Sequence, residues 1–424
     1  MLNTTFIKEP LSQKNLLFSV LIGISIVISL AFAYIYSASA SGNIVKITSK
    51  WGQMENPTIA IDNSDNTILA WQAKGEKSYE IMFQKFDNYG IPVGFPKRAN
   101  RYRPNDQQNP RIAMGKDGDY VMVWQSYQQD GSGTGIYGRH FSADGKKISD
   151  EFRANTFLIG NQSNPDIAMN EAGQYVIVWM SEGQNGFLKD IHAQIFNSEG
   201  EKIGKEIKVS SGERRIEDSP SVAIDRKGNF MVVWQGYKND DWNIYGQIFD
   251  STGNRKSDND ILVNKTTEFE QQHPDVVTIA SNKFMVVWSN QTLHDILETT
   301  MENISGQIFM TSGNKSRNEF MITSPIFGHQ EHPSVTQISL SEAYITWENY
   351  FKHGDDANAW NIYGKVMLSN GTGNSDLEQI SDVTDRWNKN PMIASNGDRE
   401  IGVIWTSLNH KKYKTAIHYK KISD

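Results

Sequence analysis

The residues that decide the fold are PRIAMGKDGDYVMVW, running from Pro110 to Trp124. A short apolar run follows the proline, and the polar turn 116–119 separates it from an alternating segment that ends at the tryptophan. Apolar runs divided by a turn with glycine are typical of two antiparallel strands joined as a hairpin. The stretch therefore predicts one hairpin, with strands A and B.

The spacing between this proline and this tryptophan recurs along the chain. Seven of the twelve prolines are followed 14 residues later by a tryptophan. The pairs are Pro57 and Trp71, Pro110 and Trp124, Pro165 and Trp179, Pro220 and Trp234, Pro274 and Trp288, Pro333 and Trp347, and Pro391 and Trp405. A fixed period of this size indicates a structural repeat, so the tryptophans are interpreted as core positions.

Each repeat also contains signals for two further strands. Strand C is predicted in segments such as Ile244–Phe249, and strand D in segments such as Glu206–Ser210, with a turn ending in glycine between the two. Four antiparallel strands in each repeat are the blade of a β-propeller. The prediction is an all-β fold, a seven-bladed β-propeller whose blades start near residues 57, 110, 165, 220, 274, 333 and 391.

The two ends of the repeat region indicate how the ring closes. The last repeat stops after Ile417–Ile422 and lacks a strand D, whereas Ile44–Thr48 has the strand D pattern and precedes the first repeat. We therefore expect the N-terminal strand to complete the last blade, which removes the exposed edges of an open array.

The repeated motifs P-x-[IV]-A, [YF]-x-V-x-W and N-I-Y-G-Q-x-F resemble the repeats of secreted and cell-surface β-propeller proteins of bacteria and archaea. The resemblance covers residues 44–424, with departures such as Ala193 in place of the strand C glycine. It implies a surface or extracellular component, with no reaction common to the group and no catalytic residue to carry over.

Residues 1–43 are predicted to be a targeting segment that precedes the propeller at 44–424. The stretch Leu16–Tyr36 holds 21 residues without a charge, which is long enough to cross a bilayer as a helix. Lys8 and Lys14 precede it and favour a cytoplasmic N-terminus. A cleaved signal peptide is the alternative, with a site at 38–40. We expect a secreted or cell-surface protein, anchored by a single membrane pass if the segment is not cleaved.

Composition excludes several classes of function. The chain has no cysteine, so disulfide scaffolds, cysteine nucleophiles and iron–sulfur sites are ruled out. With 42 basic against 49 acidic residues the net charge is −7, which disfavours nucleic acid as a partner. The sequence contains no P-loop, no G-x-S-x-G and no H-E-x-x-H motif. We expect no cofactor.

Variable loops predict a binding face. From the repeat tryptophan to the first isoleucine of strand C the chain takes 10 to 16 residues, whereas the A–B turns keep one length. Loops that vary on a rigid scaffold commonly carry function. Four tryptophans outside the repeat position fall in the variable loops, and three of the variable loops contain a tyrosine. These seven aromatic residues are candidates for contact with a protein or a glycan. These residues are Trp51, Trp242, Trp360, Trp387, Tyr127, Tyr237 and Tyr350. Trp242 and Trp360 both precede N-I-Y-G, so capping of strand C is the alternative for those two.

Histidines raise the possibility of a metal near the channel mouth. His329 and His332 are three residues apart, and His273 occupies the position before the proline one blade earlier. The same position is held elsewhere by Asn56, Asn109, Asn164, Ser219 and Asn390, which favours a polar side chain bonded to local backbone. The acidic pairs Asp240–Asp241 and Asp355–Asp356 lie outside any calcium-loop pattern and are interpreted as solvated.

Three hypotheses for function follow. The first is a non-catalytic module that binds a surface protein or glycan through the variable loops. The alternative is a secreted carbohydrate-active enzyme, of glycoside hydrolase or lyase type, working at the channel mouth. A structural component of a surface layer is the third. A cleft with converging carboxylates would favour the enzyme, and a shallow aromatic surface would favour the binding module.

Overall fold

The computed structural model describes residues 37–41, 44–49, 53–184, 186, 188–211, 216–294, 299–323, 328–353, 357–382, 386–409 and 414–423. Contacts divide the chain into Met1–Ile35 and Tyr36–Asp424, and the second unit holds all of the described residues. In these ranges the regular elements are strands, and no helix there is long and apolar enough to cross a membrane. The predicted helix Leu16–Tyr36 lies outside the described residues.

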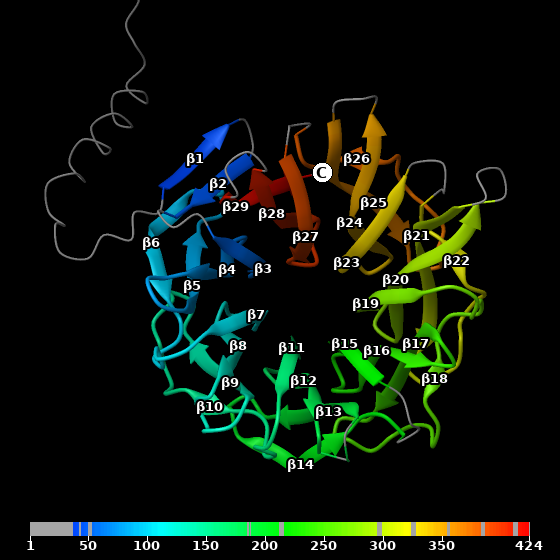
Figure 1. Ribbon diagram of the computed structural model, residues 1–424, viewed down its shortest axis with the longest axis horizontal. Helices are drawn as coiled ribbons and strands as arrows, with labels where there is room; N and C mark the ends of the chain where they lie inside the picture. The colour runs from blue at the N-terminus through cyan, green and yellow to red at the C-terminus, as the bar shows by residue number, and fades with distance from the viewer. Residues whose placement is uncertain are drawn as a thin grey trace, which may run out of the picture. The chain divides into compact units, whose positions relative to one another are not determined.

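The strands form small antiparallel sheets arranged around a central axis, as a β-propeller (Figure 1). Five of these sheets have four strands each. The first two sheets comprise β3 (Met54–Ile61), β4 (Thr67–Lys74), β5 (Tyr79–Phe86) and β6 (Pro92–Arg98), then β7 (Gln107–Met114), β8 (Tyr120–Tyr127), β9 (Thr134–Phe141) and β10 (Phe152–Arg153). The third comprises β11 (Gln162–Met169), β12 (Tyr175–Glu182), β13 (Lys189–Phe196) and β14 (Lys202–Lys208). The fourth and fifth comprise β15 (Ile216–Ile224), β16 (Phe230–Lys238), β17 (Asp241–Phe249) and β18 (Ile261–Leu262), then β19 (Gln271–Ile279), β20 (Lys283–His294), β21 (Thr299–Met310) and β22 (Phe320–Met321).

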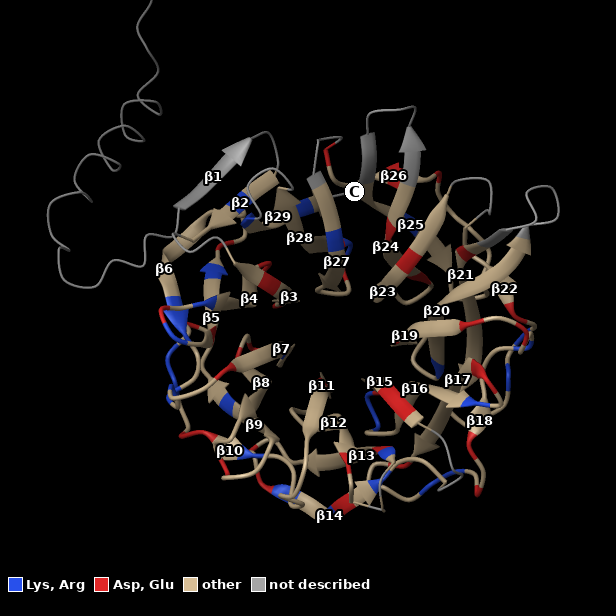
Figure 2. Ribbon diagram, in the orientation of Figure 1, with Lys and Arg blue, Asp and Glu red and all other residues tan. Residues whose placement is uncertain are grey.

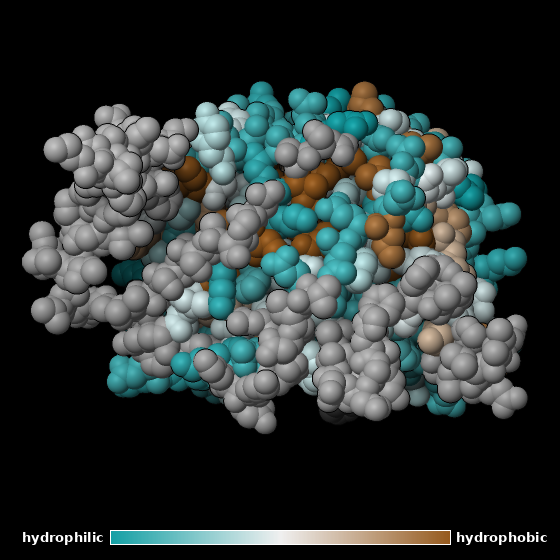
Figure 3. All heavy atoms as spheres, turned by 90° about the horizontal axis from the view of Figure 1, so that it is seen from above, coloured by the Kyte–Doolittle hydropathy of each residue, from teal (hydrophilic) through white to brown (hydrophobic). Residues whose placement is uncertain are grey.

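The remaining strands belong to one nine-stranded sheet. It contains β23 (His329–Ser339), β24 (Glu342–His353), β25 (Ala357–Leu368), β26 (Glu378–Gln379), β27 (Arg386–Ser395), β28 (Glu400–Asn409), β29 (Lys414–Ser423), β2 (Ile44–Thr48) and β1 (Ser37–Ser41). A single parallel bridge between Trp360 and Trp387 joins its two halves. Seen from above, the described surface is mostly hydrophilic, with apolar residues gathered in a band near its centre (Figure 3).

The expected closure of the ring is present. Strand β2 pairs antiparallel with β29, so that Ile44 lies opposite Lys420 and Ile47 lies opposite Ile417. An additional strand, β1, pairs with β2 and was not predicted. The N-terminal strand therefore completes the sheet that ends the chain.

The core lies between neighbouring sheets, as the repeat predicts. All seven repeat tryptophans are buried. Trp124, for example, packs in one cluster with Ile68 and Phe83 of the preceding sheet, and its indole N–H donates to Gln107 Oε1 at 3.1 Å. Six of the tryptophans fill the space between two sheets in this way, and Trp405 fills the space between the two halves of the nine-stranded sheet. Burying such large side chains stabilises the propeller without disulfides.

Two boundaries differ from the prediction. Strand A begins before the proline, at Gln107 in β7, because a shift in register at Asn109–Pro110 lets the strand continue on both sides. Strand D has only two residues in β10, β18, β22 and β26. As the outermost strand it has one neighbour and little apolar surface to bury, so its pairing is short.

Candidate functional site

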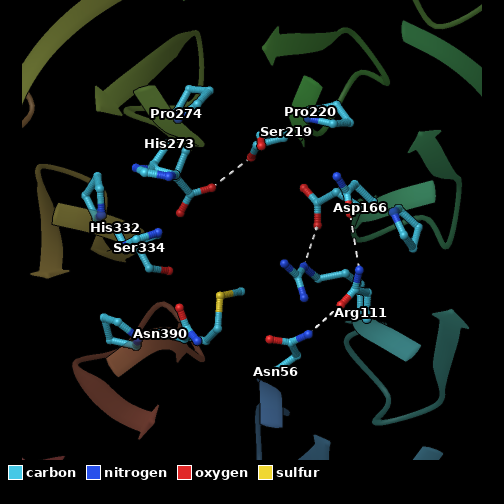
Figure 4. Close-up of a pocket in the computed structure, with 18 of the residues that line it drawn as sticks. Asn56, Arg111, Asp166, Ser219, Pro220, His273, Pro274, His332, Ser334 and Asn390 are labelled. Atoms are coloured by element: carbon cyan, nitrogen blue, oxygen red, sulfur yellow. Dashed lines mark hydrogen bonds and ion pairs between the residues drawn. The ribbon is translucent and has the colours of Figure 1, made fainter. Parts of the chain in front are cut away.

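Innermost strands of the ring converge on a central cavity of about 430 Å³ (Figures 1 and 4). Each of these strands carries, just before its proline, a residue with φ between 48° and 54°. These residues are Asn56, Asn109, Asn164, Ser219, His273, His332 and Asn390, and all of them line the cavity. Non-glycine residues rarely adopt this left-handed conformation. Its recurrence before each proline marks a repeated β-bulge, and the seven residues at this bulge line the same cavity.

Asparagines on one side of the mouth hold one another. Asn56 Nδ2 donates to Asn109 Oδ1, Asn109 Nδ2 donates to Asn164 Oδ1 at 3.2 Å, and Asn164 Nδ2 donates to Asp218 at 2.7 Å. The backbone N–H of Asn109 donates to Gln72 Oε1 of the preceding sheet at 3.0 Å. On this side the side chain before the proline bonds to side chains of neighbouring sheets, so the predicted bonding to local backbone is wrong for these asparagines.

Histidines occupy two of these positions on the opposite side of the cavity from Arg111 and Asp166 (Figure 4). The rings of His273 and His332 lie 3.8 Å apart between centroids. His332 Nδ1 forms an ion pair with Glu348 Oε1, and Lys389 Nζ lies 3.8 Å from the other carboxylate oxygen, Oε2. The His332 side chain is 34% exposed, whereas that of Glu348 is 0% exposed. An accessible imidazole is therefore backed by a buried carboxylate.

Glu348 departs from the pattern of its own repeat. The residue after the repeat tryptophan is Gln72, Gln125 or Gln235 in three other sheets, where its Oε1 accepts the backbone N–H of the next sheet. The Glu348 oxygens accept no hydrogen bond within the described residues, and their partners are His332 and Lys389. A buried carboxylate is costly without paired charges. Because Glu348 replaces a structural glutamine with a charge that is unfavourable to bury, we interpret it as a functional residue.

Ionisation differs sharply among neighbouring groups. Burial lowers the pKa of His273 to about 3, and the charge of His332 acts in the same direction. His273 therefore stays neutral at pH 7. Burial raises the pKa of Glu331, with the Glu348 and Glu302 carboxylates adding to the shift and His332 opposing it. Ionisable groups with environments this different are typical of acid–base sites.

Aromatic side chains continue the site along the same sheet. The Tyr350 and Trp360 rings lie 5.1 Å apart, and Lys389 Nζ lies 3.9 Å from the centre of the Trp360 ring. Trp387, which is 36% exposed, pairs with Trp360 across β25 and β27. We call this set the β23–β27 surface. It comprises His329, Glu331, His332, Glu348, Tyr350, Trp360, Trp387 and Lys389.

The structure brings together six of the residues predicted for a site and leaves others apart. Those on or beside the β23–β27 surface are His273, His329, His332, Tyr350, Trp360 and Trp387. Tyr237 and Trp242 form a separate pair 5.3 Å apart on β16 and β17, and Tyr127 is exposed at the end of β8. Trp51, Asp355 and Asp356 lie outside the described residues.

Sequence reasoning missed Glu348 and Lys389. The signal for Glu348 was present, since it is the only acidic residue that follows a repeat tryptophan. Lys389 carried no such signal, because its contacts come from the approach of β27 to β25. Glu331, His332 and Glu348 offer ligand atoms within 4.8 Å of one another, but the ammonium of Lys389 already balances Glu348. The metal hypothesis for His273, His329 and His332 stays a prediction.

Asp166 and Arg111 form a second charged pair on the side of the cavity opposite the histidines, with Arg111 Nε 3.8 Å from Asp166 Oδ1 (Figure 4). Asp166 Oδ2 accepts the backbone N–H of Val222 in the next sheet at 3.0 Å. Burial raises the pKa of Asp166 to about 6, with Arg111 opposing the shift and Asp275 adding to it. The carboxyl is therefore harder to ionise in the folded protein than in the unfolded chain.

This shift predicts a pH dependence of stability. The folded pKa of Asp166 lies above the unfolded value of about 3.9, so its contribution is complete below pH ~4 and is lost as pH rises through about 6. Relative to Asp166→Asn, the unaltered protein should lose about 2 kcal/mol of unfolding free energy between pH 4 and 7. Urea unfolding at several pH values measures this, and a difference that does not change with pH would contradict it.

Comparisons with known proteins identify structures of similar fold but no protein family. No protein-family model matches the chain, and no curated protein does. An ulvan lyase, described as a new family of polysaccharide lyase, has a TM-score of 0.56 at 10% identity over 86% of this chain and 93% of its own. A protein of unknown function from Dyadobacter fermentans has a TM-score of 0.53 at 12% identity, over 77% of this chain and 99% of its own. An alpha-L-arabinofuranosidase from Fusarium graminearum has a TM-score of 0.51 at 11% identity, over 74% of this chain and 92% of its own.

Identities this low establish a shared fold alone, and residue roles cannot be transferred. What the site can do has to come from its own groups. An accessible imidazole held by a buried carboxylate can exchange protons with a bound molecule. The exposed Trp387 nearby can stack on the apolar face of a sugar ring.

Proposed function

We propose that this chain is a carbohydrate-active enzyme that works at the mouth of the central cavity, with His332 as the acid–base group and Glu348 as the residue that positions it. The observation that carries the proposal is the buried Glu348 carboxylate, which is directed at His332 where three other sheets have glutamine. A carboxylate in this position fixes the orientation of the imidazole and stabilises it when protonated.

Both reaction types suited to such a site use an accessible proton carrier. In hydrolysis a proton is delivered to the glycosidic oxygen as its bond to the anomeric carbon breaks and water adds to that carbon. In elimination a proton is removed from the carbon beside a carboxyl group as a C=C bond forms and the glycosidic oxygen on the next carbon leaves and takes up a proton. His332 supplies this group, while Trp360 and Trp387 offer ring faces for the sugar. The cavity of about 430 Å³ lies within the range of small-molecule sites. Among proteins of like fold, the names of the ulvan lyase and the arabinofuranosidase also indicate action on carbohydrates.

We also propose where the enzyme works and how many blades its ring has. We place the catalytic ring outside the cytoplasm, secreted or anchored through Leu16–Tyr36, since a cell meets most polysaccharides there. We also propose that the ring has seven blades, with the nine-stranded sheet contributing two of them, because seven proline–tryptophan repeats are present.

A substrate panel tests the proposal. The full chain is incubated with neutral and uronic-acid polysaccharides, and reducing ends and unsaturated products are measured separately to distinguish hydrolysis from elimination. We expect turnover that Trp360→Ala reduces strongly. The matched control is Trp242→Ala, since Trp242 also precedes N-I-Y-G and packs on a tyrosine but, within the part of the chain that the structure describes, has no His–Glu pair beside it. Equal loss in both variants would contradict the assigned site.

A non-catalytic glycan-binding module is the second candidate, favoured by the exposure of Trp387. Binding on a glycan array without turnover of any bound polysaccharide would select it over the enzyme.

A further inference from the structure

We propose that the β5–β6 turn and strand β6 form a surface that rests on a lipid bilayer. Four large apolar side chains within seven residues are exposed there: Tyr89 (81%), Ile91 (51%), Val93 (49%) and Phe95 (76%). Apolar side chains clustered on a surface in this way usually mark a contact. We call these four residues the β6 patch.

The fold itself does not require apolar residues at three of these four positions, as the third sheet shows, whereas the fourth, Val93, corresponds to Ile203. Gly90 and Gly94 align with Gly200 and Gly204, and all four glycines have positive φ. At the positions of Tyr89, Ile91 and Phe95 the third sheet has Glu199, Glu201 and Lys205. The same turn and bulge are thus built with charged residues, so another cause is needed for the apolar ones.

The β6 patch lies beside the part of the sheet that leads to the predicted membrane span. Lys421 Nζ of β29 donates to the backbone oxygen of Asn88 at 2.7 Å, and β29 pairs with β2. Only seven residues separate Tyr36, the end of the predicted span, from Ile44 at the start of β2. Five of these seven residues form β1, which pairs with β2, so an uncleaved span would end directly before a strand of this sheet and would keep this side of the ring near the bilayer.

The chemistry of the β6 patch also suits a bilayer. Tyrosine and phenylalanine favour the membrane interface, and basic residues favour anionic headgroups. Lys97 follows the β6 patch on the same strand and is exposed, and this strand changes from tan to blue along its length (Figure 2).

A second copy of the chain is a poorer occupant. Strand β6 is the outer edge of its sheet, but Pro92 and Pro96 have no N–H to donate and the Gly94 bulge interrupts the edge. Both features oppose the addition of another strand.

The absence of cysteine allows a clean experiment. Asn88→Cys and Ser198→Cys place a label at aligned, exposed turn positions of the first and third sheets. The full chain carrying a fluorophore at either site is reconstituted in vesicles of phosphatidylcholine and phosphatidylglycerol that contain nitroxide lipids. We expect strong quenching at position 88 and weak quenching at position 198.

A variant that copies the third sheet then tests the patch itself. Tyr89→Glu, Ile91→Glu and Phe95→Lys, combined with Asn88→Cys, should lower quenching to the level at position 198, with an unchanged near-ultraviolet circular dichroism spectrum. Equal quenching at positions 88 and 198 before these substitutions would overturn the proposal. Energy transfer between labelled chains in place of lipid quenching would assign the patch to a second copy and would also overturn it.

Discussion

Replacing Glu348 by glutamine is expected to reduce turnover of the polysaccharide substrate by about 10²- to 10⁴-fold while the ring stays folded. The fold tolerates the change because glutamine already follows the repeat tryptophan at positions 72, 125 and 235. The amide cannot balance a protonated His332, and it no longer fixes the orientation of that imidazole. Initial rates on the substrate identified by the panel measure the effect.

The split between kcat and KM separates this positioning role from a merely structural one. Because the Glu348 carboxylate is buried behind the imidazole, Glu348→Gln should lower kcat with little change in KM. His332→Asn introduces the residue found at 56, 109, 164 and 390, and it should abolish turnover without unfolding the protein. Activity close to that of the unaltered chain in both variants would disprove the acid–base assignment.

Much of the fold was predictable because the repeat applies one physical rule many times. A tryptophan 14 residues after a proline recurs seven times, and each such indole is buried between neighbouring sheets or, for Trp405, between the two halves of the nine-stranded sheet. The predicted strand Ile44–Thr48 is present as β2, as expected because the last repeat lacks a strand D of its own beside β29. The ends of strands A and D were less predictable, because bulges and edge pairing depend on neighbouring sheets.

The candidate site was predictable only in part, because its members come from strands far apart in sequence. His332 was identified from its spacing to His329, and Trp360 from its place outside the repeat. Their connection through Lys389 depends on the approach of β27 to β25, which neither motif encodes. Tyr237 and Trp242 show the limit of such reasoning, since they have the same local pattern as Tyr350 and Trp360 without ionisable partners of the same kind.

Ile47→Asp is expected to destabilise the ring by about 3–5 kcal/mol, since it places a charge where a buried side chain closes the structure. Ile47 lies in one cluster with Trp71, Ile417 and Tyr419, and is almost fully buried. Strand β2 is the only neighbour of β29 on its outer side, so weakening it exposes the edge of β29 as well as the core beneath it.

The conservative change Ile47→Val is the matched control, and it should cost only about 1 kcal/mol because the strand and its pairing remain. Guanidinium unfolding followed by tryptophan fluorescence measures both, since seven buried indoles report on the whole ring. If the Asp variant unfolds at the same midpoint as the Val variant, the N-terminal strand does not close the ring in solution. A lower midpoint with a single transition would mean that closure and the cores between the sheets form one cooperative unit, so that the cavity mouth depends on a strand far from it in the sequence.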